Sequence, residues 1–124
     1  MVDVSRADFE RMVGDALDEI PDALAKELEN VAVMVEDWPT PAQLSRLPHG
    51  STLLGLYEGV PLTKRGPLSY NGVAPDRITI FQGPLSRRAG DVEGLAAQVR
   101  VTVLHEVGHY FGMDEVRLRE LGWA

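Results

Sequence analysis

Apolar residues near the start of the chain recur at steps that a helix brings to one face. Between residues 5 and 18 this apolar set is Phe9, Met12, Val13, Ala16 and Leu17. Pro21 interrupts the pattern, and residues 22–29 predict a second short helix. The chain is therefore expected to begin with two helices.

Three later runs predict β-strands. Residues 31–36 are rich in valine and apolar on both faces, so we expect an interior strand there. Residues 53–58 and 77–82 predict a second and a third strand. The third strand precedes the last long helix. We expect it either at a sheet edge, where an extended substrate could add to it, or as an ordinary strand of the core.

Proline and glycine mark the connecting segments. Residues 41–52 predict a loop with at most one helical turn, and residues 84–88 predict a short basic turn or helix. Residues 59–76 predict a longer loop, which either rims a site or simply connects two strands.

The C-terminal third predicts a long helix followed by a short one. Residues 95–104 are apolar enough for a buried helix, with Asp91 as a plausible N-cap and Gly112 where a left-handed C-terminal residue would end it. Leu118, Leu121 and Trp123 predict a last short helix that closes against the body. Together these elements predict a single α+β domain over residues 1–124, with a small mixed sheet packed on the long helix.

The long helix ends in the segment His105-Glu106-Val107-Gly108-His109. Residues four apart lie on one face of a helix, so His105 and His109 can bind one zinc ion from a single turn. Glu106 lies beside them, where a carboxylate can take a proton from water that the metal activates. The spacing is typical of a zinc peptidase.

A third ligand requires the helix to stop. At roughly 100° per residue, position 115 would lie about 280° round from His105 on a continuous helix, facing away from the metal. A break at Gly112 allows the backbone to turn, and Glu115 then stands at the offset of the third ligand in metzincin-type peptidases. Asp114 is the neighbouring alternative, and Glu120 a more distant one.

Other interpretations of these residues remain open. His105 and His109 are also compatible with ordinary helix histidines, one packed and one exposed, and acidic residues after a helix are commonly solvated charge. His49 is a lone loop histidine with no partner nearby in sequence, and we interpret it as a surface residue.

Composition narrows the class of protein. Apolar residues make up 44% of the 124 residues and charged residues 25%, as expected of a globular domain. The absence of cysteine excludes a disulfide framework and a thiolate metal site, so any metal must use nitrogen and oxygen ligands. The first residues lack the features of a signal peptide and no run reaches membrane-spanning length, which predicts a cytoplasmic protein that does not enter a membrane.

The charge of the chain bears on its partners. Twelve basic against nineteen acidic residues give a net charge of −7, which disfavours nucleic acid as a partner. Residues 64–100 are instead locally basic. This asymmetry is either solvated surface or a sign that the substrate carries carboxylates.

The chain also resembles a known family. The resemblance runs from about residue 30 to the end, and it is carried by residues 59–65, 75–80, 84–85 and 99–115. In these segments the chain is similar to the very small bacterial zincin-like metallopeptidases, sometimes called minizincins. The resemblance implies a zincin fold with one zinc ion, His105 and His109 as ligands, Glu106 as general base and the acidic residue at 115 as third ligand. The family typically has aspartate at that last position.

The function predicted on these grounds is a zinc-dependent peptidase that acts on a peptide or protein substrate. A tyrosine hydroxyl, from Tyr70 or Tyr110, is a candidate to meet the oxyanion. Only fifteen residues follow His109, so one side of the cleft is expected to be open, and an activating protein partner is a further possibility. The alternative function is a metal-binding interaction or regulatory module with little peptidase activity. A domain without metal is a third interpretation.

Overall fold

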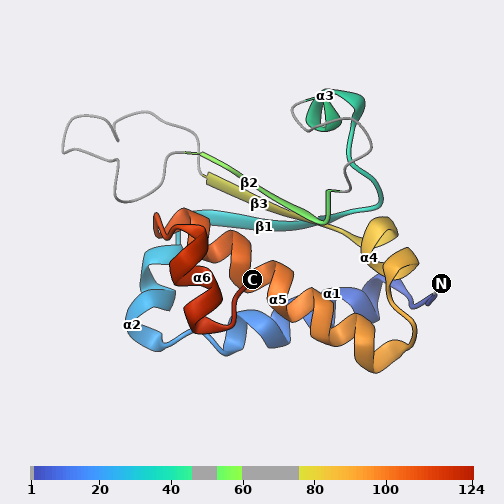
Figure 1. The fold of residues 1–124 in the computed structure, drawn as a ribbon, viewed down its shortest axis with the longest axis horizontal. Helices are drawn as coiled ribbons and strands as arrows, with labels where there is room; N and C mark the ends of the chain where they lie inside the picture. Colours follow the sequence, from blue (N-terminus) through green and yellow to red (C-terminus); the bar gives the residue numbers. More distant parts are fainter. Residues whose placement is uncertain (1, 46–52, 60–75) are drawn as a thin grey trace.

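The computed structural model describes residues 2–45, 53–59 and 76–124. Its elements form two layers, with a small sheet on one side and most of the helices on the other (Figure 1). Mixed helices and strands confirm the predicted α+β class. The predictions for His49 and Tyr70 fall outside the described residues.

The sheet has three strands, β1 (Val31–Glu36), β2 (Gly55–Glu58) and β3 (Asp76–Phe81). Their spatial order is β1-β3-β2, with β1 parallel and β2 antiparallel to β3. The third predicted strand is therefore the central strand of the core, and among the described residues β1 and β2 lie at the two edges of the sheet. Of the two positions predicted for the strand at residues 77–82, the position in the core is confirmed and the position at a sheet edge was wrong.

The prediction of an interior strand at residues 31–36 was also wrong. In β1 the burial alternates, with Val31, Val33 and Val35 half-buried and the residues between them exposed. Met34, for example, keeps 38% of its surface exposed. An apolar run does not encode whether a second neighbour will flank the strand, so a valine-rich edge strand and an interior strand look alike in sequence.

The N-terminal helices follow the predicted pattern. Helix α1 (Arg6–Asp18) is capped by the Ser5 side chain and buries Phe9, Val13 and Ala16. The second predicted helix is present as α2 (Asp22–Ala25), which continues into the 3₁₀ turn η1 (Lys26–Leu28). The loop after β1 contains one helical turn, α3 (Pro41–Leu44), capped by Thr40.

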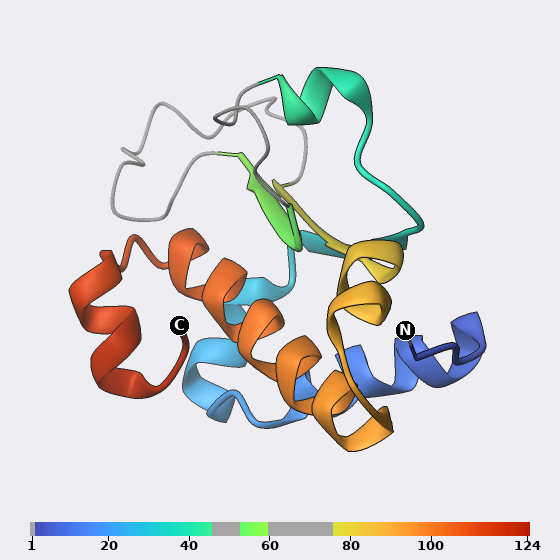
Figure 2. The same cartoon turned by 45° about the vertical axis from the view of Figure 1, so that its right-hand side comes forward.

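The long helix α5 (Val92–Tyr110) is the centre of the molecule. It is preceded by α4 (Gln82–Arg88) and followed by α6 (Glu115–Leu121). As expected, Asp91 caps its start, and Gly112 adopts a left-handed φ of 79° just beyond its end. Helix α5 contacts both the sheet and α1, so it is covered on two sides (Figure 2). Its residues Leu95, Val99, Val103 and Val107 are completely buried.

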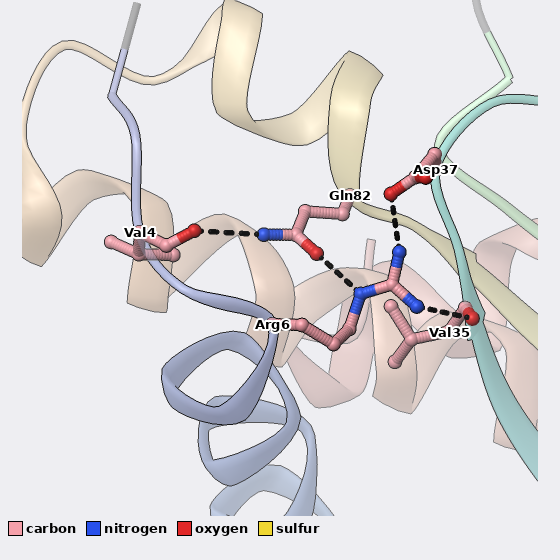
Figure 3. Close-up of polar contacts among 5 residues, drawn as sticks. All are labelled: Val4, Arg6, Val35, Asp37 and Gln82. Carbon is pink, nitrogen blue, oxygen red and sulfur yellow. Dashed lines mark hydrogen bonds and ion pairs between the residues drawn. The ribbon is translucent and has the colours of Figure 1, made fainter.

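A polar contact joins the start of α1 to the sheet and to α4. The Arg6 guanidinium donates to the backbone carbonyl of Val35 at 3.1 Å and to the side chain of Gln82 at 2.7 Å, and it pairs with Asp37 (Figure 3). Gln82 in turn donates to the Val4 carbonyl at 3.1 Å. The ion pair is exposed, with 40% of the Arg6 side chain and 76% of the Asp37 side chain accessible, so the contact fixes the orientation of the elements more than it stabilises them.

Within the part of the chain that the structure describes, no helix combines the length and the apolar character needed to cross a bilayer.

Candidate metal centre

The last turns of α5 bring the two histidines together. His105 and His109 lie four residues apart on the same face, with ring centroids 4.6 Å from each other and planes at 82°. Both side chains are part-buried, with 25% and 36% of their surfaces exposed. Their positions follow directly from the spacing and from the burial of the helix that carries them.

The chain then turns back toward these histidines. Gly112 takes its left-handed conformation, and the N–H of Met113 donates to the Gly108 carbonyl at 2.9 Å. Glu115 is the first residue of α6, and its Oε1 lies 3.6 Å from Nε2 of His105 and 3.8 Å from Nε2 of His109. Three potential ligand atoms thus form a triangle.

These three side chains fit a zinc ion. Zinc bonds of 2.0–2.1 Å in a tetrahedron put ligand atoms about 3.4 Å apart, close to the two separations from Glu115. All three ligand atoms lie within 4.8 Å of one another. Two nitrogens and one oxygen, with no thiolate, are the ligand set of catalytic zinc sites that keep a fourth position open.

The other acidic candidates have different places. The side chain of Asp114 accepts a hydrogen bond from the backbone N–H of Arg117 at 2.8 Å and so caps α6. Glu120 is not part of the cluster of potential ligands found among the described residues. Of the three carboxylates considered from sequence, Glu115 is the one that the fold brings to the histidines.

Both histidines are held in a form suited to metal binding. Nδ1 of His105 lies 3.0 Å from the backbone carbonyl of Trp123, which can only accept, so Nδ1 donates and the tautomer of the neutral ring that fits this contact has the lone pair on Nε2. For His109, burial is the main cause that lowers the pKa, followed by the neighbouring His105. The contact with Trp123 was not predicted, because a backbone carbonyl leaves no sign in the sequence.

A glycine within the motif allows α6 to approach α5. A Cβ placed on Gly108 would lie 2.2 Å from Cδ2 of Leu118, the completely buried residue of α6. A larger residue at 108 therefore requires the Leu118 side chain to shift. Leu118 and the part-buried Trp123 confirm the predicted closure of the last helix, whereas Leu121 remains 36% exposed.

Glu106 lies beside the ligand triangle but is far more buried, with 8% of its surface exposed. This burial raises the pKa of its carboxyl to about 7, although the neighbouring His105 and a hydrogen bond with the backbone of Tyr57 act in the opposite direction. A carboxyl in such surroundings can accept and release a proton near neutral pH.

The edge strand β2 contacts Glu106 directly. A Cβ on Gly55 would lie 2.8 Å from Cγ2 of Thr102 and 3.2 Å from Cγ of Glu106, so only glycine lets the strand come this close to α5. Glycine within a strand often marks such a close approach. Gly55 was therefore the sequence feature that could have indicated the close approach of β2 to Glu106.

The structure leaves the two tyrosine candidates without a demonstrated role. The hydroxyl of Tyr110 donates to the backbone carbonyl of Glu27 at 2.8 Å, which engages it at η1 rather than at the ligand triangle. Tyr70 lies outside the described residues.

Comparison with known proteins shows the family of the chain. The sequence profile of the zincin-like metallopeptidases matches residues 28–123, so the chain belongs to the zincin-like metallopeptidase family. A solved structure of a conserved hypothetical protein from T. thermophilus is similar, with 26% identity and a TM-score of 0.57, covering 95% of this chain and 97% of the other. No curated protein matches the chain significantly.

Proposed function

We propose that this protein is a zinc-dependent peptidase. The observation that supports this most strongly is the triangle formed by His105, His109 and Glu115 next to the buried carboxyl of Glu106. A purely structural zinc site has a closed set of ligands and needs no base, whereas this arrangement has three ligands and a base. In addition, the chain belongs to the zincin-like metallopeptidase family.

In this proposal each residue has a separate role. His105, His109 and Glu115 would hold the ion, and Trp123 would keep His105 oriented through its carbonyl. When bound, zinc polarises the scissile carbonyl and makes water more acidic. Glu106 takes the proton from the attacking water and returns it to the leaving amine. Its hydrogen bond with the backbone of Tyr57 holds the carboxylate against the edge of β2.

The test is cleavage of a diverse peptide mixture, read by mass spectrometry. Zinc-loaded protein is compared with its Glu106→Gln variant, which keeps the shape of the side chain but removes the base. We expect cuts with the wild type and a rate lower by about 10² to 10⁴ with the variant. Glu93→Gln, an exposed carboxylate in the first turn of the same helix, is the matched control and should cut like wild type.

The zinc content of all three proteins is measured in parallel. Equal zinc in each, with no cuts that depend on Glu106, would contradict the peptidase and favour a metal-binding interaction module. Cuts that survive both Glu106→Gln and a chelator would come from a contaminating protease.

A further inference from the structure

A groove leads from Glu106 along α5. Its floor is one stripe of the helix, at positions 97–98, 101–102 and 105–106, and its opposite wall is formed by Leu53, Leu54 and Gly55. The cavity has a volume of about 650 Å³. At 1.5 Å per residue, the stripe from Gln98 to Glu106 is about 12 Å long, the length of three to four residues of extended peptide.

The wall of this groove presents a strand edge. The Leu54 carbonyl accepts from the Phe81 N–H at 3.0 Å and therefore points toward β3. Backbone groups alternate in direction along a strand, so those of Gly55 point to the other side. Among the described residues β3 is the strand with which β2 pairs, and a peptide can add along the opposite edge.

The direction of such a peptide follows from the direction of β2. Leu53 lies with Arg88 at one end of the groove, and Gly55 contacts Glu106 at the other, so β2 runs toward the metal centre. Antiparallel pairing is slightly the more stable arrangement. A peptide bound in this way places the residues that follow its scissile bond in the groove, with Arg88 ahead of them.

A second cavity of about 480 Å³ adjoins the far end of the groove. Leu53 and Arg88 line both cavities, and Trp38 and Leu44 line the second, with 50% and 41% of their surfaces exposed. The Arg87 guanidinium lies 4.9 Å from the centroid of the Trp38 ring. The apolar surface therefore continues past Arg88.

The two arginines at this junction are free of ion pairs with described residues. Arg6, Arg11, Arg77 and Arg100 each pair with a carboxylate of this chain. Among the residues that the structure describes, the other arginines have no carboxylate partner, and of these Arg87 and Arg88 are the two that line the cavities. In a chain of net charge −7, two cations without a carboxylate partner beside an apolar groove complement a ligand that is apolar and carries a carboxylate.

We propose that this groove selects substrates with an apolar residue after the scissile bond and a carboxylate three or four residues beyond it, which Arg88 binds with the help of Arg87. The inference rests on the proposed peptidase function, because it assigns the substrate of the same site. The carboxylate belongs either to an acidic side chain or to the C-terminus of the peptide.

The experiment compares cleavage of matched peptides by zinc-loaded protein. Peptides with leucine after the scissile bond carry Asp or Asn at the third and fourth positions beyond it, and each is made with a free or an amidated C-terminus. We expect kcat/KM to be about fivefold higher for peptides with a carboxylate, because an exposed ion pair supplies about this much at most. The change should appear in KM and not in kcat. Comparing Asp with Asn in amidated peptides, and acid with amide in Asn peptides, identifies the source of the carboxylate.

Two variants make the test specific. Arg88→Gln should lower kcat/KM for the carboxylate peptides to the value that the same variant gives with the neutral peptides. Lys26→Gln removes the same charge from exposed η1, away from the groove, and should keep the preference. Equal cleavage of charged and neutral peptides by the wild type would overturn the inference, as would a preference that persists in both Arg88→Gln and Arg87→Gln.

A binding measurement separates this inference from the peptidase proposal. The same peptides, fluorescently labelled, are titrated with zinc-loaded Glu106→Gln protein and with its Arg88→Gln double variant, and fluorescence anisotropy is recorded. A preference for carboxylate that depends on Arg88 would support the groove even if no peptide is cut. No preference, or no binding at millimolar protein, would overturn it even if Glu106-dependent cleavage is observed.

Discussion

Helices α5 and α6 supply the same candidate metal centre but are held in opposite ways. Helix α5 has nineteen residues, is covered by the sheet and by α1, and carries two candidate ligands and the proposed base. Helix α6 has seven residues, buries Leu118 alone, and carries a candidate ligand whose side chain is 57% exposed. Two of the candidate ligands are thus fixed by a core helix, and the third by a few contacts between two helices.

This difference separates what stabilises the fold from what completes the site. Loss of packing around α5 should unfold the protein. Loss of the contact of α6 with Gly108, or of the contact of Trp123 with the ring of His105, should leave the fold and reduce zinc affinity.

The largest effect should come from the interface between α1 and α5. Phe9 is completely buried there, so Phe9→Ala should lower the free energy of unfolding by about 3–5 kcal/mol. Val116→Ala, at a residue of α6 that is 59% exposed, should change it by less than about 0.5 kcal/mol. Urea denaturation in the presence of chelator measures both, and similar losses would contradict the division between the two helices.

Burial in α5 should also make the metal-free protein sensitive to pH. A carboxyl whose pKa rises from 4.5 to about 7 on folding destabilises the ionised folded state by about 3 kcal/mol. Because the pKa of Glu106 is raised in the folded state, protonated Glu106 does not lower the free energy of unfolding below pH 4.5. That part of the stability is lost as the pH rises from 4.5 to about 7 and the carboxyl ionises. Glu106→Gln should therefore match the wild type near pH 4.5 and be about 3 kcal/mol more stable at pH 8.

The lowered pKa of His109 acts in the opposite sense, since its contribution to the free energy of unfolding is lost as the pH falls below 6.5. Subtracting the free energy of unfolding of the wild type from that of Glu106→Gln at each pH cancels the contribution of His109, because both proteins contain it. A difference that does not change with pH, measured by urea denaturation without metal, would show that Glu106 is not desolvated as described.

On α6, the choice between the two acidic residues can be measured. Glu115→Gln should weaken zinc binding by more than about 100-fold, the upper range for partners outside the ligand set, with little change in metal-free stability. Asp114→Ala removes only the N-cap, worth about 1 kcal/mol, and should weaken zinc binding by about fivefold at most. Competition with a chromophoric chelator gives both affinities, and the reverse order would reassign the third ligand.

The smallest effect is expected where α6 meets α5. In Gly108→Ala the new methyl group would overlap Leu118, and overpacking of this kind costs about 1–3 kcal/mol. Zinc affinity should fall by roughly tenfold as Glu115 shifts. Gly14→Ala in α1 has open space around it and should keep zinc affinity while slightly stabilising the helix. Unchanged zinc affinity in Gly108→Ala would show that the close approach does not position the ligand.

Sequence by itself determined the local features of this protein. The spacing of His105 and His109, the N-cap at Asp91 and the left-handed residue at Gly112 all depend on neighbours within a few positions, and the structure has the helix that they predict. The approximate bounds of the strands followed from short apolar runs in the same way, β-branched in β1 and β3.

Only the tertiary structure decided how these elements meet. The place of β3 in the centre of the sheet, the approach of β2 to Glu106 at Gly55 and the carbonyl of Trp123 at His105 each join residues far apart in sequence. Such contacts depend on backbone direction and on how closely two elements approach, and an apolar pattern records neither. The sequence therefore predicted the pair of histidines on one helix face, and the fold decided which carboxylate, carbonyl and strand edge lie beside them.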